Sequence, residues 1–419
     1  MAAEDAHEDT QGPVVLVGAG QAGAWVATTL RERAPDRPIT LVGDESHPPY
    51  ERPPLSKAIL AGTSPPESAW LRPPAAYAEA GIELCTGRRV KAIDRDARAV
   101  VLEDGSRLGW SRLVLATGSR PRRLALPGSD HPRVHMLRTL ADAAALAPVL
   151  RPGARLVAIG GGFIGLEVAA VARAAGCEVT VLERAPTVLP RVMAPEVAAR
   201  IAAVHAAQGV AFQLSAEVTA IEEAEGAAAV VLSDGRCLPA DAVLVGIGAE
   251  PVTELAQAAG LACDDGILVD ACGRTSDPAI FAAGDVTRHF NPLLERHLRL
   301  ESWQNAQNHG IAVGRTLAGE DAPHAEIPWF WSDQYDLNIQ MVGAPTGWDR
   351  VIWRGEAGGA KGTAIYLAGD RVVAGNTLNN ARDIRFLRDL IRRAAPVDPA
   401  QAADSAVRLK DLASAQVSP

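Results

Sequence analysis

Two segments of the chain repeat the same order of apolar and polar positions. In each, a short apolar run ends in glycine, a stretch with helical character follows, and a second apolar run comes next. This is the order of a strand–helix–strand unit in a parallel sheet. The glycine-rich turns begin at Gly18 and Gly160, a domain's length apart, which indicates a duplicated architecture. The six predicted elements are residues 13–18, 22–33 and 39–42, and residues 155–159, 163–175 and 178–182.

Further apolar runs extend this pattern along the chain. Asp104-Gly105 and Asp234-Gly235 each follow an alternating run and are typical of hairpin turns. After Pro328, tryptophans become frequent in a segment with strand-like alternation, and a predicted helix follows at 381–395. The stretch after Pro396 is rich in Ala and Asp, so we expect weak structure there. Together these elements predict an α/β protein with two Rossmann-like dinucleotide-binding domains and a smaller α+β C-terminal domain. The additional predicted strands are residues 99–102, 112–116 and 242–245.

Composition narrows the class of protein. The 419 residues are 48% hydrophobic and 22% charged, which suits a globular protein with sizeable cores. A formal net charge of −9 argues against nucleic acid as a partner. No apolar run is long enough for a membrane span. Residues 1–13 are polar and lack the apolar region of a secretory signal, so we expect a disordered lead and a cytoplasmic protein. The five cysteines are scattered without a close pair, so neither a disulfide framework nor a metal site is expected.

The first glycine turn has the spacing of a dinucleotide site. Gly18 permits a tight turn, Gly20 lets the backbone approach a pyrophosphate, and Gly23 lets the helix pack close to the strand. The helix N-terminus then offers N–H groups and a partial positive charge to the phosphates. Asp44 lies near the end of the next strand, where an acid can bind a ribose hydroxyl. A glycine-rich turn that only packs is the alternative.

The second glycine turn predicts a second dinucleotide site. Gly160, Gly162 and Gly165 again follow a strand and begin a helix. Glu183 ends the next strand, and a carboxylate there accepts from both ribose hydroxyls and repels a 2′-phosphate, which favours NAD over NADP. Arg184 beside it weakens that preference.

Three charged residues outside the turns have open interpretations. Two prolines stiffen the loop 49–57 and would aim Arg52 and Lys57 from a rigid base, although an ordinary exposed basic loop is the alternative. Glu167 follows Gly165 in the second helix and is either functional or an acid that favours the helix dipole.

Seven segments in order carry a family resemblance. The chain resembles the FAD-dependent ferredoxin reductases of bacterial oxygenase systems, and the reductase components of biphenyl-type Rieske dioxygenases are the nearest group. The resemblance covers about residues 14–395. The segments are the turn at Gly18, Arg52-Pro-Pro-Leu-Ser-Lys57, Leu115-Ala-Thr-Gly118, Gly160-Gly-Gly-Phe-Ile-Gly-Leu-Glu167, Phe281-Ala-Ala-Gly-Asp285, Glu301-Ser-Trp-Gln-Asn-Ala-Gln307 and Pro328–Asp336.

The resemblance implies where the domains lie. A discontinuous FAD domain would comprise residues 14–124 and 249–327, and an NAD domain, residues 125–248, would be inserted into it. Residues 328–419 would form the C-terminal α+β domain.

The resemblance also implies roles for individual residues. Lys57, Glu167 and Trp303 would act in catalysis, the first two near the flavin N5 and Trp303 beside the isoalloxazine, where some relatives have an aliphatic residue. Asp44 would bind the FAD adenosine ribose, Asp285 would bond the flavin ribitol, and Val90 would contact adenine through its backbone. The full FAD set is Gly18, Gly20, Gly23, Asp44, Arg52, Lys57, Val90, Ala116, Thr117, Gly118, Arg138, Asp285 and Trp303. The full NAD set is Gly160, Gly162, Phe163, Ile164, Gly165, Glu183 and Gly248.

The implied reaction is hydride transfer from NADH to FAD, followed by single-electron transfer to a [2Fe–2S] ferredoxin that serves an oxygenase. A Rieske aromatic-ring dioxygenase is favoured and a cytochrome P450 is second. The alternatives are an NADH oxidase, a rubredoxin or quinone reductase, and an NADH-sensing flavoprotein. Because such ferredoxins are acidic, a basic docking patch is expected, although the second candidate cluster could be a solvated helix face. The two candidates are Arg288, His289, Arg296 and Arg299, and Arg385, Arg388 and Arg392.

Overall fold

The computed structural model describes residues 12–356 and 358–414. Residues 1–11 of the expected disordered lead lie outside this part of the chain. The chain divides into two compact units, and each is assembled from several segments. The first unit contains residues 66–120 and 249–326 together with the chain up to Arg52, and the second contains 53–65, 121–248 and 327 onwards. The predicted division into three domains stays a prediction.

The first unit is built on a five-stranded sheet in the order β19-β7-β1-β2-β3, and all neighbouring strands are parallel. Its apolar strands are buried on both faces, as the continuous apolar runs predicted. The strands are β1 (Val14–Val17), β2 (Ile39–Val42), β3 (Ile82–Cys85), β7 (Arg112–Leu115) and β19 (Ile280–Ala282).

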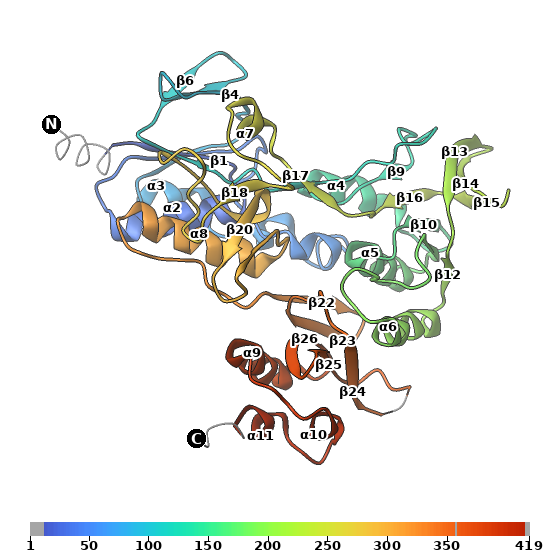
Figure 1. The fold of residues 1–419 in the computed structure, drawn as a ribbon. Coiled ribbons are helices and arrows are strands. Elements are labelled where there is room, and N and C mark those ends of the chain that lie inside the picture. The colour runs from blue at the N-terminus through green and yellow to red at the C-terminus, as the bar shows by residue number, and fades with distance from the viewer. Residues whose placement is uncertain (1–11, 357, 415–419) are drawn as a thin grey trace. The chain divides into compact units, whose positions relative to one another are not determined.

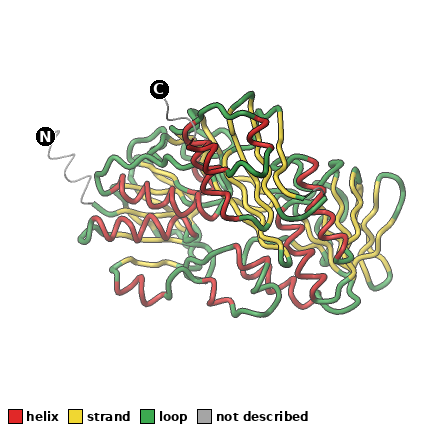
Figure 2. Tube along the Cα trace, turned by 90° about the horizontal axis from the view of Figure 1, so that it is seen from below, coloured by secondary structure: helices red, strands yellow, loops and turns green. Residues whose placement is uncertain are grey.

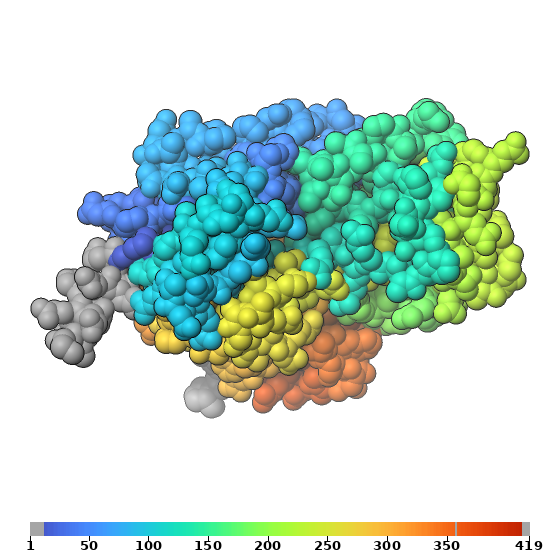
Figure 3. Space-filling model, turned by 90° about the horizontal axis from the view of Figure 1, so that it is seen from above, coloured from blue at the N-terminus to red at the C-terminus, as the bar shows by residue number. Residues whose placement is uncertain are grey.

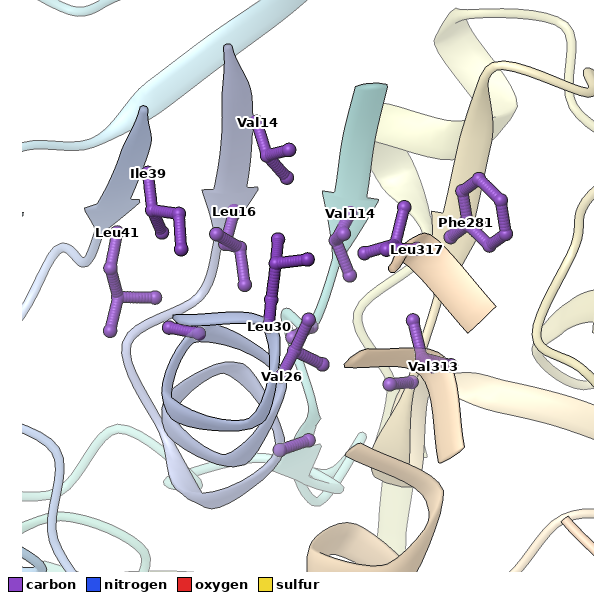
Figure 4. Packing of buried hydrophobic residues seen from close by; sticks show 14 of the residues in the cluster. Val14, Leu16, Val26, Leu30, Ile39, Leu41, Val114, Phe281, Val313 and Leu317 are labelled. Carbon is purple, nitrogen blue, oxygen red and sulfur yellow. The ribbon is translucent and has the colours of Figure 1, made fainter. Parts of the chain in front are cut away.

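Helices α2 (Gln21–Arg33) and α8 (Trp303–Leu317) pack against each other and cover one face of this sheet (Figures 1 and 4). Leu16, Leu30 and Val313 are fully buried between the layers, and each such side chain contributes about 1.5–3 kcal/mol of transfer free energy. Glycines bring the helices together, because a Cβ at Gly310 would lie 2.7 Å from the carbonyl oxygen of Ala22.

The other face of the sheet carries a small antiparallel sheet, β4 (Val90–Asp94), β5 (Ala99–Leu102) and β6 (Arg107–Gly109). The predicted turn at Asp104-Gly105 joins β5 to β6. Helix α7 (Glu254–Ala258) packs against β4, and Figure 3 shows the cyan sheet beside this yellow segment. This unit also contains α3 (Pro74–Glu79) and β17 (Ala249–Pro251), which pairs with β8 (Ser119–Pro121). A further small sheet is formed by β18 (Ile267–Val269), β20 (Thr287–Asn291) and β21 (Arg296–Leu298).

The second unit contains the other predicted dinucleotide fold. Its parallel sheet has the order β12-β11-β10-β16-β9 and is accompanied by a three-stranded antiparallel sheet, β13-β14-β15. The predicted turn at Asp234-Gly235 joins β14 to β15. The strands are β9 (Val134–His135), β10 (Arg155–Ile159), β11 (Glu178–Glu183), β12 (Val210–Leu214), β13 (Val218–Ala224), β14 (Ala227–Leu232), β15 (Cys237–Ala240) and β16 (Ala242–Val245). The helices are α4 (Leu140–Leu146), α5 (Phe163–Ala174) and α6 (Pro195–Ala207).

The tryptophan-rich segment forms a five-stranded antiparallel sheet within the second unit, in the order β22-β23-β26-β25-β24. It shares a hydrophobic core with α5 and α6, where Leu166, Val197 and Tyr366 are buried together. The hydroxyl of Tyr366 accepts a hydrogen bond of 3.0 Å from the backbone N–H of Ala194. Figure 2 shows strands in yellow and helices in red near the C-terminus. The elements are β22 (Trp329–Gln334), β23 (Leu337–Gly343), β24 (Arg350–Gly355), β25 (Gly362–Ala368), β26 (Arg371–Leu378) and α9 (Ile384–Arg393).

The expectation of weak structure after Pro396 was wrong for most of the described part of this segment, residues 397–414. Two short helices form there, α10 (Pro399–Ala403) and α11 (Leu409–Ser414). Arg354 of β24 donates to the carbonyl oxygens of Ala402 at 2.6 Å and Asp404 at 2.8 Å, and also to that of Val407. These long-range bonds anchor the segment, and composition alone does not reveal them.

Candidate functional site

The first glycine turn has the close backbone contacts that its spacing predicted. Gly18 has a φ of +115°, and a Cβ on it would lie 2.2 Å from the carbonyl oxygen of Ala116. A Cβ on Gly23 would lie 2.1 Å from the carbonyl oxygen of Gly18. Gly20 has no atom within 4 Å of its own Cβ position, so there is open space beside this residue. Only glycine fits at Gly18 and Gly23, and the turn leaves room for a ligand at Gly20.

Helix α2 begins at this turn without a capping side chain and without an acid in its first turn. Its first backbone N–H groups therefore have no side-chain acceptor at the N-terminus, which is the donor set that a pyrophosphate needs. The residues at this turn fit a dinucleotide.

The acid and the loops predicted beside this turn come from neighbouring strands of the same sheet. Asp44 follows β2, and its carboxylate lies 3.1 Å from Arg89 in an exposed ion pair. Val90 begins β4 with its side chain buried. Thr117 donates to the carbonyl oxygen of Val252 at 2.7 Å, and Gly118 has a φ of +69°. Because Ala116–Gly118 and Asp44 follow β7 and β2, the two neighbours of β1, they flank the turn at Gly18.

Arg52 and Asp285 lie near each other in the first unit. Arg52 donates to Glu45 at 2.9 Å and to the hydroxyl of Tyr50 at 3.1 Å. Burial opposes the charge of Arg52, but Tyr50, Glu45 and Asp285 nevertheless raise the pKa of the guanidinium. Asp285 accepts a hydrogen bond of 3.1 Å from Ser119.

Trp303 begins α8, where the side chain of Ser302 caps the helix by accepting from the backbone N–H of Asn305. The indole N–H of Trp303 donates to Glu51 at 3.1 Å. Glu51 precedes Arg52, so this bond connects the start of α8 to the segment that carries the predicted basic residue.

The second glycine turn repeats the geometry of the first. Gly160 has a φ of +109°, and its Cβ would lie 2.4 Å from the carbonyl oxygen of Gly246. A Cβ on Gly165 would lie 2.2 Å from the carbonyl oxygen of Gly160, whereas the nearest atom to one on Gly162 is 3.7 Å away. Helix α5 starts with no side-chain cap and no acid in its first turn. This N-terminus also fits a pyrophosphate.

Glu183 is oriented by backbone groups of the second turn. Its two carboxylate oxygens accept from the N–H groups of Gly161 and Ala185, each at 2.8 Å. Since a carboxylate has about four acceptor positions, it keeps capacity for ribose hydroxyls. Gly248 has a φ of +110°, and a Cβ there would lie 3.0 Å from the guanidinium of Arg191.

Phe163 and Ile164, the first residues of α5, differ in their surroundings. Ile164 is 40% exposed, as a ligand-facing residue can be. The ring of Phe163 instead packs against Phe330 of β22, with ring centroids 4.6 Å apart. A contact of Phe163 with NAD therefore remains a prediction, and its backbone N–H at the helix start is the group best placed to make it.

Lys57 and Glu167 meet inside the second unit. Lys57 follows the short 3₁₀ helix η1 (Pro53–Ser56), and its ammonium lies 2.7 Å from Oε2 of Glu167. Glu167 is 4% exposed and also accepts hydrogen bonds from Ser56 and, at 2.5 Å, from Ser332. Because Glu167 lies beyond the first turn of α5 and its carboxylate has these partners, the ion pair explains its position better than the helix dipole does.

Arg138 directly precedes the capping box of α4, in which Thr139 and Asp142 exchange hydrogen bonds. The backbone N–H of Arg138 donates to Asp142 at 2.9 Å. Arg138 belongs to the second unit with Lys57 and Glu167, and helix α4 packs near η1 in this unit.

The structure distinguishes the two candidate docking clusters. In the first, Arg288 pairs with Asp264, and Arg299 pairs with Asp265 at 3.0 Å and with Glu301. Including His289 in a basic cluster was wrong, because this side chain is fully buried and burial lowers its pKa to about 4. The positive charge of this loop is thus largely matched by neighbouring acids.

The second cluster lies on α9. Arg385 is exposed and stacks over Phe386 at 4.4 Å, and Arg392 is exposed and lies 3.9 Å from Asp389. Ile384, Leu387, Leu390 and Ile391 of α9 are buried, and Arg385 and Arg392 lie on its exposed side. Arg388, the third arginine of the predicted cluster, is only partly exposed.

Several polar contacts of the predicted residues were not anticipated. Ser56 lies inside the recognised loop, and Ser332 lies inside the recognised Trp-Ser-Asp-Gln segment, so a signal existed for both. Glu51, which accepts from Trp303, also lies inside the loop 49–57, whereas Ser119, which donates to Asp285, carries no sequence signal of its own. In the described part of the chain, no group of three or more His, Cys, Asp or Glu could hold a metal ion. None of the described helices is long and apolar enough to cross a membrane.

Two uncapped helix N-termini on two parallel sheets, each with glycine-only contacts, define an oxidoreductase-type architecture for two dinucleotides. Residues 12–310 match the family described as pyridine nucleotide-disulphide oxidoreductase, and residues 329–413 match the reductase C-terminal family. The chain belongs to the pyridine nucleotide-disulphide oxidoreductase family. This confirms the predicted α/β fold class, and the chain is an FAD- and NAD-dependent oxidoreductase.

Relatives match nearly the whole chain. The ferredoxin–NAD(+) reductase component of an anthranilate 1,2-dioxygenase system from Burkholderia cepacia is 47% identical over 95% of this chain and 98% of the relative. Putidaredoxin reductase from Pseudomonas putida is 43% identical over 96% and 97%. The crystal structure of a covalent putidaredoxin reductase–putidaredoxin complex matches with a TM-score of 0.93 and 42% identity, over 97% of this chain and 99% of that one. These matches confirm the resemblance drawn from the sequence motifs.

Proposed function

We propose that this protein is an NADH-dependent ferredoxin reductase, which takes a hydride from NADH by means of FAD and delivers electrons singly to a [2Fe–2S] ferredoxin. The observation that carries the proposal is the pair of uncapped helix N-termini, α2 and α5, each at a turn where a Cβ would lie about 2 Å from a backbone oxygen. One turn would hold each dinucleotide. When bound, FAD supplies the exchange between a two-electron donor and a one-electron acceptor.

The residues around each turn have distinct tasks in this proposal. Asp44, Arg52 and Asp285 would bind FAD with the turn at Gly18, and Glu183 would bind the NADH ribose beside the turn at Gly160. Lys57 and Glu167 would order the surroundings of the flavin N5, and Trp303 would align the nicotinamide. All five cysteines are free thiols, so single electrons would leave from the flavin without a thiol relay.

The acceptor is proposed from the relatives. The reductase at 47% identity belongs to an anthranilate 1,2-dioxygenase system, and others belong to p-cumate and biphenyl dioxygenase systems. A Rieske dioxygenase is therefore the favoured terminal oxygenase. A cytochrome P450 is second, supported by a matching structure of a ferredoxin reductase for the CYP199A2 system. A cytoplasmic location is part of the proposal, and free thiols are typical of a reducing compartment.

Reduction of cytochrome c by NADH, with and without an added [2Fe–2S] ferredoxin, tests the proposal. We expect turnover to depend on the ferredoxin and to be far slower in its absence. Equal rates with and without ferredoxin, accompanied by rapid oxygen consumption, would show an NADH oxidase instead. Very slow NADH oxidation in both cases would indicate an NADH sensor.

A further inference from the structure

Strand β22 uses alternate residues for two purposes. Side chains of a strand point in turn to opposite faces, and Phe330, Ser332 and Gln334 contact Phe163, Glu167 and His205 on one face. Trp329 and Trp331 lie on the other face and stack on each other with ring centroids 5.1 Å apart. The face with Ser332 and Gln334 therefore points toward Glu167, and both of these polar side chains are buried.

The hydrogen bonds along this face run in a single direction. Oε1 of Glu167 can only accept as a carboxylate, so the hydroxyl of Ser332 donates to it at 2.5 Å. The oxygen of Ser332 then accepts from the amide N–H of Gln334 at 3.0 Å. This leaves the amide oxygen of Gln334 as an acceptor, and it faces Nε2 of His205 at 2.7 Å. His205 must therefore donate from Nε2, which fixes its tautomer.

His205 suits the end of such a chain. It lies on α6 with no exposed surface, and burial lowers its pKa although the bond with Gln334 opposes this. A neutral imidazole carries one N–H, and here it is committed to Gln334. The ring is held edge-on by Phe212 and Tyr335, at centroid distances of 6.3 and 5.0 Å. Its orientation is thus constrained both by these ring contacts and by the hydrogen bond to Gln334.

We propose that Ser332, Gln334 and His205 form a directional hydrogen-bond relay that holds the carboxylate of Glu167 against the ammonium of Lys57. They are positioning residues, since they act through Glu167. Without Gln334 and His205, the hydroxyl of Ser332 could rotate away, and one oxygen of Glu167 would lose its partner. All of these residues belong to the second unit. The effect of the relay on turnover rests on the proposed function, but its effect on Lys57 does not.

Three relay variants and one control test the relay in the FAD-loaded enzyme. His205→Phe keeps an aromatic ring between Phe212 and Tyr335 but removes the donor, and His205→Gln restores an amide N–H near the position of Nε2. Ser332→Ala removes only a hydroxyl, so it still tests the relay if His205→Phe folds poorly. Thr377→Val is the matched control, because Thr377 is a fully buried strand residue whose hydroxyl has no hydrogen-bond partner among the described residues.

Two readouts separate the relay from general damage. The first is the rate at which a small N-hydroxysuccinimide ester acylates Lys57, followed by peptide mass spectrometry. The second is the stopped-flow rate constant for hydride transfer from NADH, measured with the dissociation constant of NADH. We expect Ser332→Ala and His205→Phe to raise the first rate and lower the second about three- to tenfold, as loss of one hydrogen bond implies. The affinity for NADH should change less than about twofold, because the relay acts on Glu167 and not on binding.

The outcomes decide the proposal. His205→Gln and Thr377→Val should both behave as the wild type. If His205→Gln were as defective as His205→Phe, packing rather than hydrogen bonding would be the cause, and the relay would be wrong. Unchanged acylation of Lys57 in Ser332→Ala would also overturn it. If the wild type failed to reduce ferredoxin, the proposed function would be wrong. The relay would still be supported if the variants changed the rate at which Lys57 is acylated.

Discussion

The ammonium of Lys57 lies 2.7 Å from Oε2 of Glu167, and the side chains of the two residues are 24% and 4% exposed. A nearly buried carboxylate loses most of its hydration, so its remaining partners must replace the lost water contacts. Two serine hydroxyls and one ammonium do so here. Removing one partner from such a group costs more than the intact pair contributes, because the other charge is left without compensation.

Glu167→Gln should therefore weaken both stability and catalysis. The amide keeps the shape but loses the charge, and we expect the free energy of unfolding to fall by about 1–3 kcal/mol, since Lys57 remains partly solvated. If the pair acts on the flavin, hydride transfer from NADH should slow about 10- to 100-fold. Urea denaturation and stopped-flow absorbance measure the two effects.

Lys57→Met and the double variant complete this experiment. Two residues in contact should show non-additive effects, so the double variant should lose less stability than the sum of the single losses. Additive losses would mean that the ion pair has no energetic role. If the rate of hydride transfer were unchanged in both Glu167→Ala and Lys57→Met, the pair would have no role in catalysis.

The sequence was sufficient to predict the elements that are governed by periodicity. The strands at 39–42, 155–159 and 242–245 lie at the predicted residues, because buried parallel strands require continuous apolar runs. Glycine spacing predicted both turns, since only glycine tolerates a backbone oxygen about 2 Å from the Cβ position.

Contacts between residues far apart in the sequence could not be predicted from periodicity or glycine spacing. Nothing near Glu167 in the sequence indicates that Ser332 contacts it, because the contact arises only when β22 packs on α5. The helices after Pro396 are held by Arg354, which lies 48 residues before its partner Ala402. Likewise, His289 looked like part of a basic loop until β20 placed it in the interior.

Substitutions in the two glycine turns should affect the binding of different dinucleotides. Gly23→Ala places a Cβ 2.1 Å from a backbone oxygen in the first unit, and Gly165→Ala places one at 2.2 Å in the second. Each should cost about 1–3 kcal/mol. We expect Gly23→Ala to lower the FAD content of the purified protein, and Gly165→Ala to weaken NADH binding while FAD is retained. Flavin absorbance and titration with NADH check this assignment.

Matched controls exist for both substitutions within the same turns. A Cβ at Gly20 meets no atom within 4 Å, and the nearest atom to one at Gly162 is 3.7 Å away. Gly20→Ala and Gly162→Ala should therefore fold normally, and any loss of affinity would come from the ligand's need for space. Loss of FAD in Gly165→Ala together with full FAD in Gly23→Ala would reverse the assignment of the two sites.

The exposed arginines of α9 predict a salt-sensitive encounter with an acidic ferredoxin. Arg385→Glu should raise the KM for ferredoxin about three- to tenfold at low ionic strength, and the difference should shrink as salt screens the charges. Lys91→Glu on β4 changes the net charge equally and serves as the control. Steady-state kinetics over a series of salt concentrations measures the effect. If both variants raised the KM equally, the effect would come from net charge and not from α9. If the KM did not depend on salt, electrostatic docking of the ferredoxin would be ruled out.

Three buried histidines of the first unit predict loss of stability in mild acid. The rings of His289, His309 and His324 lie about 5 Å apart from one another. Burial lowers the pKa of His289 to about 4 and that of His324 to about 3, and it lowers the pKa of His309 as well. The unfolded chain takes up these protons near pH 6.5, but the folded unit does not. Stability should thus be greatest above about pH 6.5 and fall as the pH drops, by about 1.4 kcal/mol per pH unit for each histidine.

His289→Leu isolates the contribution of one ring of this cluster. Neither ring nitrogen of His289 has a hydrogen-bond partner in the described part of the chain, so an apolar replacement should cost little near pH 7.5. The variant takes up one proton fewer on unfolding. Its free energy of unfolding should therefore fall less steeply toward about pH 5.5, by about 1.4 kcal/mol per pH unit. The difference between variant and wild type is the informative quantity, because burial also lowers the pKa of His135 and His205 in the second unit. Urea denaturation at both pH values, with His47→Gln as the control, provides the measurement. An acid slope equal to that of the wild type would mean that His289 is already protonated in the folded protein.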